Sequence, residues 1–433
     1  MSAPALPRPD RGLAALVAAY LTLATLYAVR VPLWEAPDAV WHYHFAAHLA
    51  AGNGLPTKAD EGVTAPWRQQ GSQPPLYYLL TAPLIAAVAP TDAATAIRYN
   101  PHAAVGIAGP GGNVNRMVHH AAEAWPWRGT VLAARLVSLA SVAFGLVAVL
   151  ATWAAARAVF PRQPAVALAS AAVLAFNPEL LFFSGAISND IAVAAAGALV
   201  LWRAAVVLRD GATPRASAWL GVACGLALLT KLSGVWLLPA AGAAVAWAAW
   251  RGVGGPDGRD GRPDDRADGP PDDGDVGEGD GSGDDHRVRA GLRPAPSHPG
   301  VTPHAAAPAA PDAFGARLAR AAAWCALPAL AVAGWWYARN WLLFGDPSGL
   351  PLMLNVMTPR PVPPTWRELA VQLATVWRSY WAVFGWFNIP APDRLYALFD
   401  GLTLAGLGGV AVLAARRRLP RAAAPGLALA AGT

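Results

Sequence analysis

Long apolar runs dominate the chain, and short polar segments separate them. Most of these runs approach the roughly 20 residues that an α-helix needs to cross about 30 Å of hydrocarbon. The runs that we predict to span a membrane cover residues 12–30, 131–156, 164–183, 191–208, 217–230, 234–250, 318–338 and 395–415. The pattern therefore predicts an all-α fold, a polytopic bundle of about eight transmembrane helices.

Two further apolar stretches are shorter or more polar than a membrane span. Residues 76–89 are interrupted by Pro83, and residues 366–387 mix aromatic side chains with charged ones. An amphipathic helix of the second kind typically lies in the interface between lipid and water. We predict that both stretches form helices on the membrane surface.

The arginines between the predicted spans indicate the orientation, because cytoplasmic loops of membrane proteins are enriched in Lys and Arg. With eight spans and a cytoplasmic amino terminus, the dense arginine clusters all fall inside. These clusters hold Arg157, Arg162, Arg209, Arg215, Arg251, Arg317, Arg320, Arg416, Arg417 and Arg418. We therefore predict a multi-pass protein of the inner (plasma) membrane. Its outside face receives the long loop 31–130, the turn 188–190, Lys231 and residues 339–392.

Composition agrees with a membrane protein, since 55% of the residues are hydrophobic and only 14% are charged. The net charge of +6 would suggest nucleic acid in a soluble protein. Here the arginines lie mostly at helix ends, so we expect the bilayer, and no nucleic acid, as a partner. Cys224 and Cys325 each fall inside an apolar run, and we expect neither a disulfide nor a cysteine metal site.

Composition also divides the chain into three parts. Residues 1–250 form an amino-terminal transmembrane catalytic region with the long outer loop. Residues 251–316 are rich in Gly, Pro and Asp and nearly lack large apolar side chains, which predicts a disordered cytoplasmic linker. Residues 317–433 form a carboxyl-terminal transmembrane region. Its last stretch, 422–433, is too short to span, so we expect the chain to be truncated.

Candidate chemistry begins directly after the first predicted span. Glu35, Asp38 and His42 lie there beside Trp34 and Trp41. A carboxylate beside tryptophans at the membrane surface is partly desolvated, which raises its proton affinity and suits it to general-base catalysis. The alternative is a solvated loop in which Asp38 caps a helix and the tryptophans form an aromatic belt.

Further motifs follow on the predicted outer face. They read Pro37-Asp38-Ala39 with His42, Gly54-Leu55-Pro56, Pro74-Pro75-Leu76-Tyr77-Tyr78, Asn189-Asp190 and Tyr337-Ala338-Arg339-Asn340. In order and spacing they resemble the GT-C superfamily of polyprenyl-phosphate-sugar glycosyltransferases, close to the protein O-mannosyltransferase and aminoarabinose transferase group and to an uncharacterised bacterial branch of it. The resemblance covers residues 12 to about 400, without the linker. Ala39 departs from the pattern, because the family often has Glu there.

The resemblance implies an inverting transfer of a sugar from a polyprenyl phosphate to an unknown acceptor on the outer face. It implies that Asp38 is the base that deprotonates the acceptor hydroxyl, with Asp190 as a second catalytic residue. Lys231 and Arg339 are the cations suited to hold the departing phosphate, although snorkelling of their side chains and capping by Asp190 are alternatives. The other residues expected to bind substrate are Glu35, His42, Gln73, Tyr77, Asn189 and Asn340.

No cofactor is expected with certainty, and a divalent cation is the one candidate. Ala39 removes a carboxylate that would help to hold it. His44 and His48 have the spacing of zinc ligands on a helix, but we expect no metal there and assign His42 to the acceptor or phosphate site. The insertion between residues 91 and 128 is expected to cover the site as a lid.

Two other classes of function stay open at this stage. A transporter or flippase would need ionisable residues along a path through the membrane, often with repeated halves, whereas the charges here collect at one surface. A non-catalytic scaffold is suggested by Ala39. The sequence determines neither the sugar, nor the acceptor, nor the oligomeric state.

Overall fold

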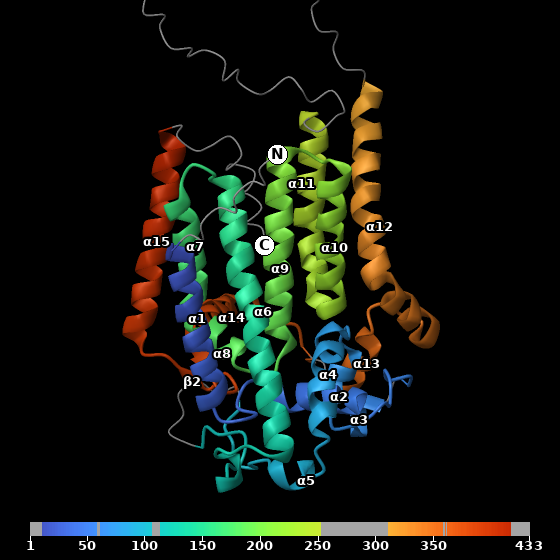
Figure 1. Ribbon diagram of the computed structural model, residues 1–433, viewed down its shortest axis with the longest axis vertical. Helices are drawn as coiled ribbons and strands as arrows, with labels where there is room; N and C mark the ends of the chain where they lie inside the picture. Colours follow the sequence, from blue (N-terminus) through green and yellow to red (C-terminus); the bar gives the residue numbers. More distant parts are fainter. Residues whose placement is uncertain are drawn as a thin grey trace, which may run out of the picture.

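The computed structural model describes residues 11–58, 61–105, 113–252, 311–357, 360 and 362–416. The predicted disordered linker lies almost wholly outside the described residues, and so does the stretch 422–433. The long helices run side by side along one axis (Figure 1). They are α1 (Arg11–Arg30), α6 (Gly129–Val159), α7 (Pro164–Ala175), α9 (Asn189–Asp210), α10 (Pro214–Thr230), α11 (Leu238–Arg251), α12 (Pro311–Phe344) and α15 (Asp393–Ala415). The short helix α8 (Pro178–Ser184) follows α7 in a different direction.

The predicted all-α class is confirmed, and every predicted span is helical. Within the described residues, 6 helices are long and apolar enough to cross a membrane, and the number rises to 7 if the bent pair α7 and α8 counts as one span. The remaining predicted span forms α10, which has 17 residues. Only short strands, β1 (Val383–Phe384) and β2 (Ile389–Pro390), pair in the part of the chain that the structure describes.

The break between α7 and α8 has a local cause. Helices α7 and α8 meet at an angle of 64°. Between them, the Asn177 side chain accepts a hydrogen bond from the Leu180 amide at 2.9 Å, and Pro178 occupies the first position of the new helix. An asparagine cap followed by proline starts a helix and cannot continue the preceding one. The chain therefore changes direction near the end of the bundle where the polar motifs lie.

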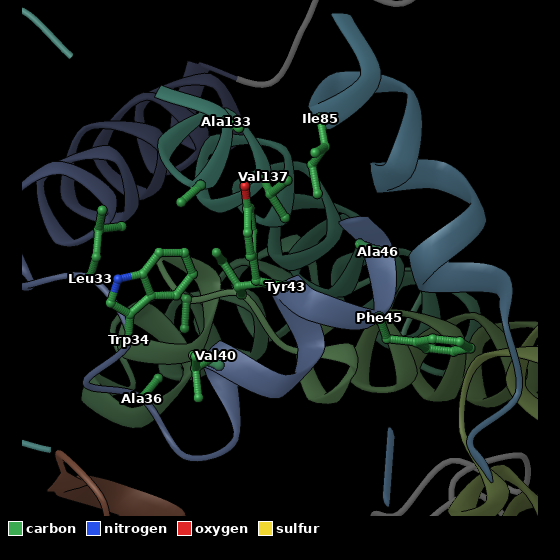
Figure 2. Packing of buried hydrophobic residues seen from close by; sticks show 14 of the residues in the cluster. Leu33, Trp34, Ala36, Val40, Tyr43, Phe45, Ala46, Ile85, Ala133 and Val137 are labelled. Atoms are coloured by element: carbon green, nitrogen blue, oxygen red, sulfur yellow. The ribbon is translucent and has the colours of Figure 1, made fainter. Parts of the chain in front are cut away.

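The first long loop is folded and packs against the bundle. It contains α2 (Ala39–Ala50), α3 (Glu61–Thr64), η1 (Arg68–Ser72), α4 (Leu76–Val88), α5 (Ala93–Ala96) and η2 (Ala121–Glu123). Figure 2 shows Tyr43 of α2 extending toward Val137 of α6, and Val40 of α2 and Ile85 of α4 belong to the same buried cluster. This buried apolar cluster fixes the backbone that carries Asp38 against the start of α6.

The two stretches predicted as surface helices form α4 and α14 (Trp366–Ala382). Helix α4 buries Tyr77, Tyr78 and Ile85, so it is part of the packed core on that side. Helix α14 exposes Trp366 and Leu373 and packs against α8 and α15. Helix α13 (Leu350–Val356) packs against α3 and η1. Both stretches form helices, but the second helix ends at Ala382 and residues 383–387 form β1 and a turn. Their placement at a membrane surface stays a prediction.

The arginine-bearing helix ends lie together, at the top of Figure 1. The alternating directions of the helices bring the carboxyl ends of α6, α9, α11 and α15 to the end of the bundle where α1 and α12 begin. The first long loop lies at the opposite end. This separation agrees with the arrangement that the arginine pattern predicts.

Helix α10 crosses α12 at small residues, which lets the backbones approach closely. A Cβ added at Gly221 would overlap the Cys325 carbonyl oxygen, whereas one added at Gly242 of α11 would meet nothing within 4 Å. We expect Gly221→Ala to lower the free energy of unfolding by about 1–3 kcal/mol, because a backbone must shift. Thermal unfolding in detergent measures the effect. Gly242→Ala is the control with the same gain in helix propensity, and equal melting temperatures of the two variants would contradict the prediction.

Candidate functional site

Asp38 precedes α2 in a left-handed backbone conformation, with a φ of 59°. Aspartate tolerates this region better than most residues do. The Asp38 side chain makes no capping hydrogen bond to α2. The alternative interpretation, in which Asp38 serves as a helix cap, is therefore wrong for its side chain. Instead, its Oδ2 accepts hydrogen bonds from the side-chain amides of Gln69 at 3.2 Å and Gln70 at 3.0 Å, both in η1. Asp38 is therefore held by two neutral donors.

Burial raises the pKa of Asp38 above its ordinary value. The hydrogen bond from Gln69 and the charge of Lys231 act against this shift, and the charge of Asp190 adds to it. A carboxylate with raised proton affinity is a stronger base than an exposed one, which suits it to accept a proton from a hydroxyl. The desolvation expected for Asp38 is present, and its position at a membrane surface stays a prediction.

A directional chain of hydrogen bonds leads from Asp38 to His42. The Tyr78 hydroxyl donates to Gln70 Oε1 at 3.2 Å, and it lies 2.8 Å from His42 Nδ1. Since the tyrosine proton goes to Gln70, Nδ1 of His42 carries the proton that meets the tyrosine oxygen. Burial lowers the pKa of His42 to about 3, so the ring is neutral. This series of hydrogen bonds orients the Gln70 side chain so that its NH₂ group points toward Asp38.

Asp190 and Lys231 form an ion pair beside this chain. Lys231 Nζ donates to Asp190 Oδ1, and Ser188 Oγ donates to Asp190 Oδ2 at 2.9 Å. Ser188 caps α9, because its hydroxyl accepts a hydrogen bond from the Asp190 backbone amide. The charges of the pair act on both Asp38 and His42. The structure thus brings together four predicted site residues from α2, α9 and the end of α10.

Asn189 and Tyr77 are buried behind this group. The Asn189 side-chain amide lies 3.4 Å from the Thr230 carbonyl, and its Oδ1 has no hydrogen-bond partner among the described residues. The Tyr77 hydroxyl pairs with Ser141 of α6 at 3.0 Å. Asn189 thus links the start of α9 to the end of α10, and Tyr77 links α4 to α6, while the contact of either residue with a substrate stays a prediction.

Arg339 and Asn340 lie elsewhere, at the end of α12. Arg339 donates to the carbonyls of Leu55 at 3.2 Å and Pro56 at 2.6 Å. Asn340 accepts from Arg339 at 3.3 Å and lies 3.4 Å from the Pro347 carbonyl. Two of the sequence motifs therefore bind each other. The observed hydrogen-bond partners of Arg339 are two backbone carbonyls and the Asn340 side chain, and its role in holding phosphate stays a prediction.

Glu35 fastens the outer insertion. Its carboxylate accepts hydrogen bonds from the amides of Arg116 at 2.8 Å and Met117 at 2.9 Å, and it pairs with His119 at 2.9 Å. His119 also pairs with Glu123 at 2.9 Å. These contacts occupy the carboxylate with the protein itself. They tie residues 116–123 to the segment that leads into Asp38.

A cavity of about 780 Å³ adjoins Lys231. It lies between the end of α10, η3 (Leu232–Leu237), α12 and α13. Its polar lining includes Lys231, Gln73 and Ser348, and Gln73 Oε1 has no hydrogen-bond partner among the described residues. The remaining lining is mostly apolar, with Leu228, Leu238, Ala329, Leu330, Ala333 and Met353. Such a cavity fits a molecule with an anionic group and an apolar tail.

The described residues contain no group of three His, Cys, Asp or Glu side chains arranged to hold a metal ion. His42 bonds to Tyr78, and His48 packs on Trp67 with ring centroids 4.1 Å apart. The helical spacing of His44 and His48 therefore does not gather further ligands in this part of the chain.

Comparison with known proteins agrees with the motifs. A family model described as dolichyl-phosphate-mannose-protein mannosyltransferase matches residues 120–260, about a third of the 433 residues. The match includes Asp190 and Lys231 and leaves out Asp38. No curated protein and no solved structure is similar enough to be matched. The match agrees with the resemblance to the GT-C superfamily over that third of the chain, and the apolar helices show a multi-pass membrane protein.

Sequence reasoning missed Gln69 and Gln70, the two residues that hold the Asp38 carboxylate. Adjacent glutamines in a polar segment carry no signature of their own. The signal that could have drawn attention is their place just before the Pro74-Pro75 motif. Their contact with a residue about 30 positions earlier follows only from the fold.

The fastening by His119 leads to a pH-dependent prediction. Its bonds to Glu123 and Glu35 raise the pKa of His119 from 6.5 to about 9. A raised folded-state pKa contributes stability that is fully present below pH 6.5 and is lost as pH rises through about 9. We expect hydrogen exchange of residues 113–128, corrected for intrinsic rates, to increase between pH 7 and pH 10.

The increase should largely disappear in His119→Gln, which is loosened at both pH values. His120→Gln is the control, because the only bond of its side chain that the structure shows is a 3.4 Å contact with the Ala96 carbonyl. An identical pH dependence in all three proteins would show that His119 does not fasten the insertion.

Proposed function

We propose that the protein is an inverting glycosyltransferase that moves a sugar from a polyprenyl phosphate to an acceptor hydroxyl at the outer face of the cell membrane. The observation that carries the proposal is the position of Asp38. Its partly buried carboxylate lies within the electrostatic reach of the Asp190–Lys231 pair, and Lys231 lines the large apolar cavity. A base, a cation and a lipid-sized cavity thus converge.

The cavity beside Lys231 suits the donor. A polyprenyl phosphate joins a long apolar chain to one anionic group, and the lining joins Leu228, Leu330 and Met353 to a single cation. The lysine side chain is about a quarter exposed, so it can meet a phosphate while it keeps its bond to Asp190. Charge-assisted bonds of this kind stabilise a leaving phosphate.

The reaction balances with these groups. The acceptor hydroxyl attacks the anomeric carbon, a new carbon–oxygen bond forms, and the bond from the anomeric carbon to the phosphate oxygen breaks. The hydroxyl proton passes to Asp38, and the electron pair of the broken bond leaves with the polyprenyl phosphate beside Lys231. Attack opposite the leaving group inverts the anomeric centre.

The hydrogen bonds to Asp38 favour this use of its carboxylate. Gln69 and Gln70 both donate to Oδ2, and no hydrogen bond from the described residues reaches Oδ1. Oδ1 is therefore the atom that we assign to the acceptor proton. The neutral Gln70–Tyr78–His42 chain holds the side chain without adding a positive charge, which would weaken the base.

The buried arginine of α6 bears on the transporter alternative. Arg135 donates to the carbonyls of Ala28 at 2.6 Å and Val31 at 2.9 Å. It ties α6 to the end of α1, where the chain leaves the helix. A side chain engaged in this way positions the segment that leads to Asp38, so it gives no support to a transport path.

The central test is transfer of radiolabelled sugar from a panel of polyprenyl-phosphate sugars. We expect Asp38→Asn to lower the rate of transfer by about 10²–10⁴-fold, the range for loss of general-base catalysis, with donor binding retained. Asp210→Asn, at the far end of α9, is the matched control. Full activity of Asp38→Asn would remove the assigned base. No transfer by the wild type from any donor would sink the proposal and favour transport or a scaffold.

The orientation has its own test. Val63 of the first loop is 52% exposed, and Gln163 is exposed at the opposite end of the bundle. In a chain with Cys224 and Cys325 replaced by alanine, we expect Val63→Cys to react with a membrane-impermeant maleimide on intact cells. Gln163→Cys should react only after lysis, since arginine-rich ends face the cytoplasm. The reverse pattern would place the site on the inner face.

A further inference from the structure

A second, smaller cavity adjoins the ion pair from the other side. Its volume is about 180 Å³, and it lies between α7, α8, α9 and α14. Asp190 lines this cavity, whereas its partner Lys231 lines the large one. The other polar side chains in the lining are Glu179, Asn177 and Tyr380, and the rest of the lining is apolar.

Glu179 is the unusual member of this lining. Its residue is only 7% exposed. Oε2 accepts a hydrogen bond from the Val383 amide at 2.8 Å, while the buried Oε1 has no hydrogen-bond partner among the described residues. No ion pair of Glu179 occurs among them either. An unsatisfied buried carboxyl oxygen is costly, and it calls for a partner that the chain does not supply.

The charge of the lining restricts the kind of ligand. Two carboxyl groups, Glu179 and Asp190, face the small cavity, and no Lys, Arg or His side chain lines it. This arrangement repels the phosphate of a donor and attracts a group that donates hydrogen bonds, a hydroxyl or an ammonium. The charged groups that line the two cavities therefore differ in sign. The cation of the ion pair, Lys231, lines the large cavity, and its carboxylate, Asp190, lines the small one.

The volume of the small cavity also argues against a polyprenyl donor as its ligand. The large cavity suits a lipid, but about 180 Å³ holds a single side chain or sugar ring and leaves no room for a polyprenyl chain. Asn177 closes the wall, since its amide donates to the Tyr380 carbonyl of α14 at 3.0 Å. The walls are thus tied together by protein bonds, and Glu179 keeps one oxygen for a ligand.

We propose that the cavity between α8, α9 and α14 is the acceptor subsite, in which Glu179 binds a hydroxyl or ammonium group of the acceptor. The inference rests on the proposed glycosyl transfer. It places acceptor and donor on opposite sides of the Asp190–Lys231 pair. Glu179 positions the acceptor, and the proton of the attacking hydroxyl passes to Asp38.

The test separates use of the acceptor from use of the donor. The probes are polyprenyl-phosphate mannose as donor, with an acetylated Ser/Thr peptide amide, methyl mannoside and methyl glucosaminide as acceptors. Hydrolysis of the donor without acceptor reports the donor half of the site. Glu179→Gln can still accept from the Val383 amide, but its new NH₂ group cannot accept the ligand's hydrogen bond.

We expect Glu179→Gln to raise the KM for the acceptor about tenfold, since one buried hydrogen bond contributes about that much affinity. The donor KM and the rate of donor hydrolysis should stay at the wild-type values. Ala194→Leu, which fills the same cavity from α9 without touching the carboxyl group, should act in the same direction. Asp210→Asn should change neither KM.

Unchanged acceptor KM values in both Glu179→Gln and Ala194→Leu would overturn the inference, and so would a rise in the donor KM instead. Donor hydrolysis without transfer to any probe would show that the class of acceptor is wrong. If the wild type neither hydrolyses nor transfers the donor sugar, the proposed function is wrong. The acceptor subsite, which depends on that function, is then wrong as well.

Discussion

A backbone inside hydrocarbon must satisfy its own hydrogen bonds, and this constraint shapes the whole molecule. It makes the apolar runs helical and confines irregular backbone to their ends. The cluster of polar residues forms where helices begin or break, at Ser188 before α9 and at Lys231 after α10. The break at Asn177 and Pro178 lies nearby and opens the small cavity. Polar side chains cluster at these helix ends because polar groups can be exposed to water there.

The Asp190–Lys231 pair organises the charges of this region. Its two members line different cavities, so one ion pair presents a cation to one side and a carboxylate to the other. Asp38 lies within reach of both charges but is bonded only to neutral amides. This separation lets the Asp38 carboxyl keep a raised pKa close to a cation, which a direct bond between Asp38 and Lys231 would not allow.

The residues of the sequence motifs fall into two groups, those near the cavities and those that bind other parts of the protein. Asp190 lines the small cavity and its charge reaches Asp38, whereas Arg339 binds the backbone of the Gly54-Leu55-Pro56 motif. Glu35 likewise holds the outer insertion. Charge and position at a helix end do not distinguish these uses, because a guanidinium or a carboxylate serves a backbone group as well as a substrate. Only the observed partners separate them.

The sequence by itself determined the helices and the clustering of arginines at one end, because apolar length and helix-end charge are local properties of the chain. It also selected Asp38, Asp190 and Lys231 by their residue types and motifs. The tertiary structure decided which side chains meet. The bond from Gln70 to Asp38 joins residues 32 apart, and the one from Arg339 to Pro56 joins residues 283 apart. Such contacts depend on how helices pack, which the local pattern does not specify.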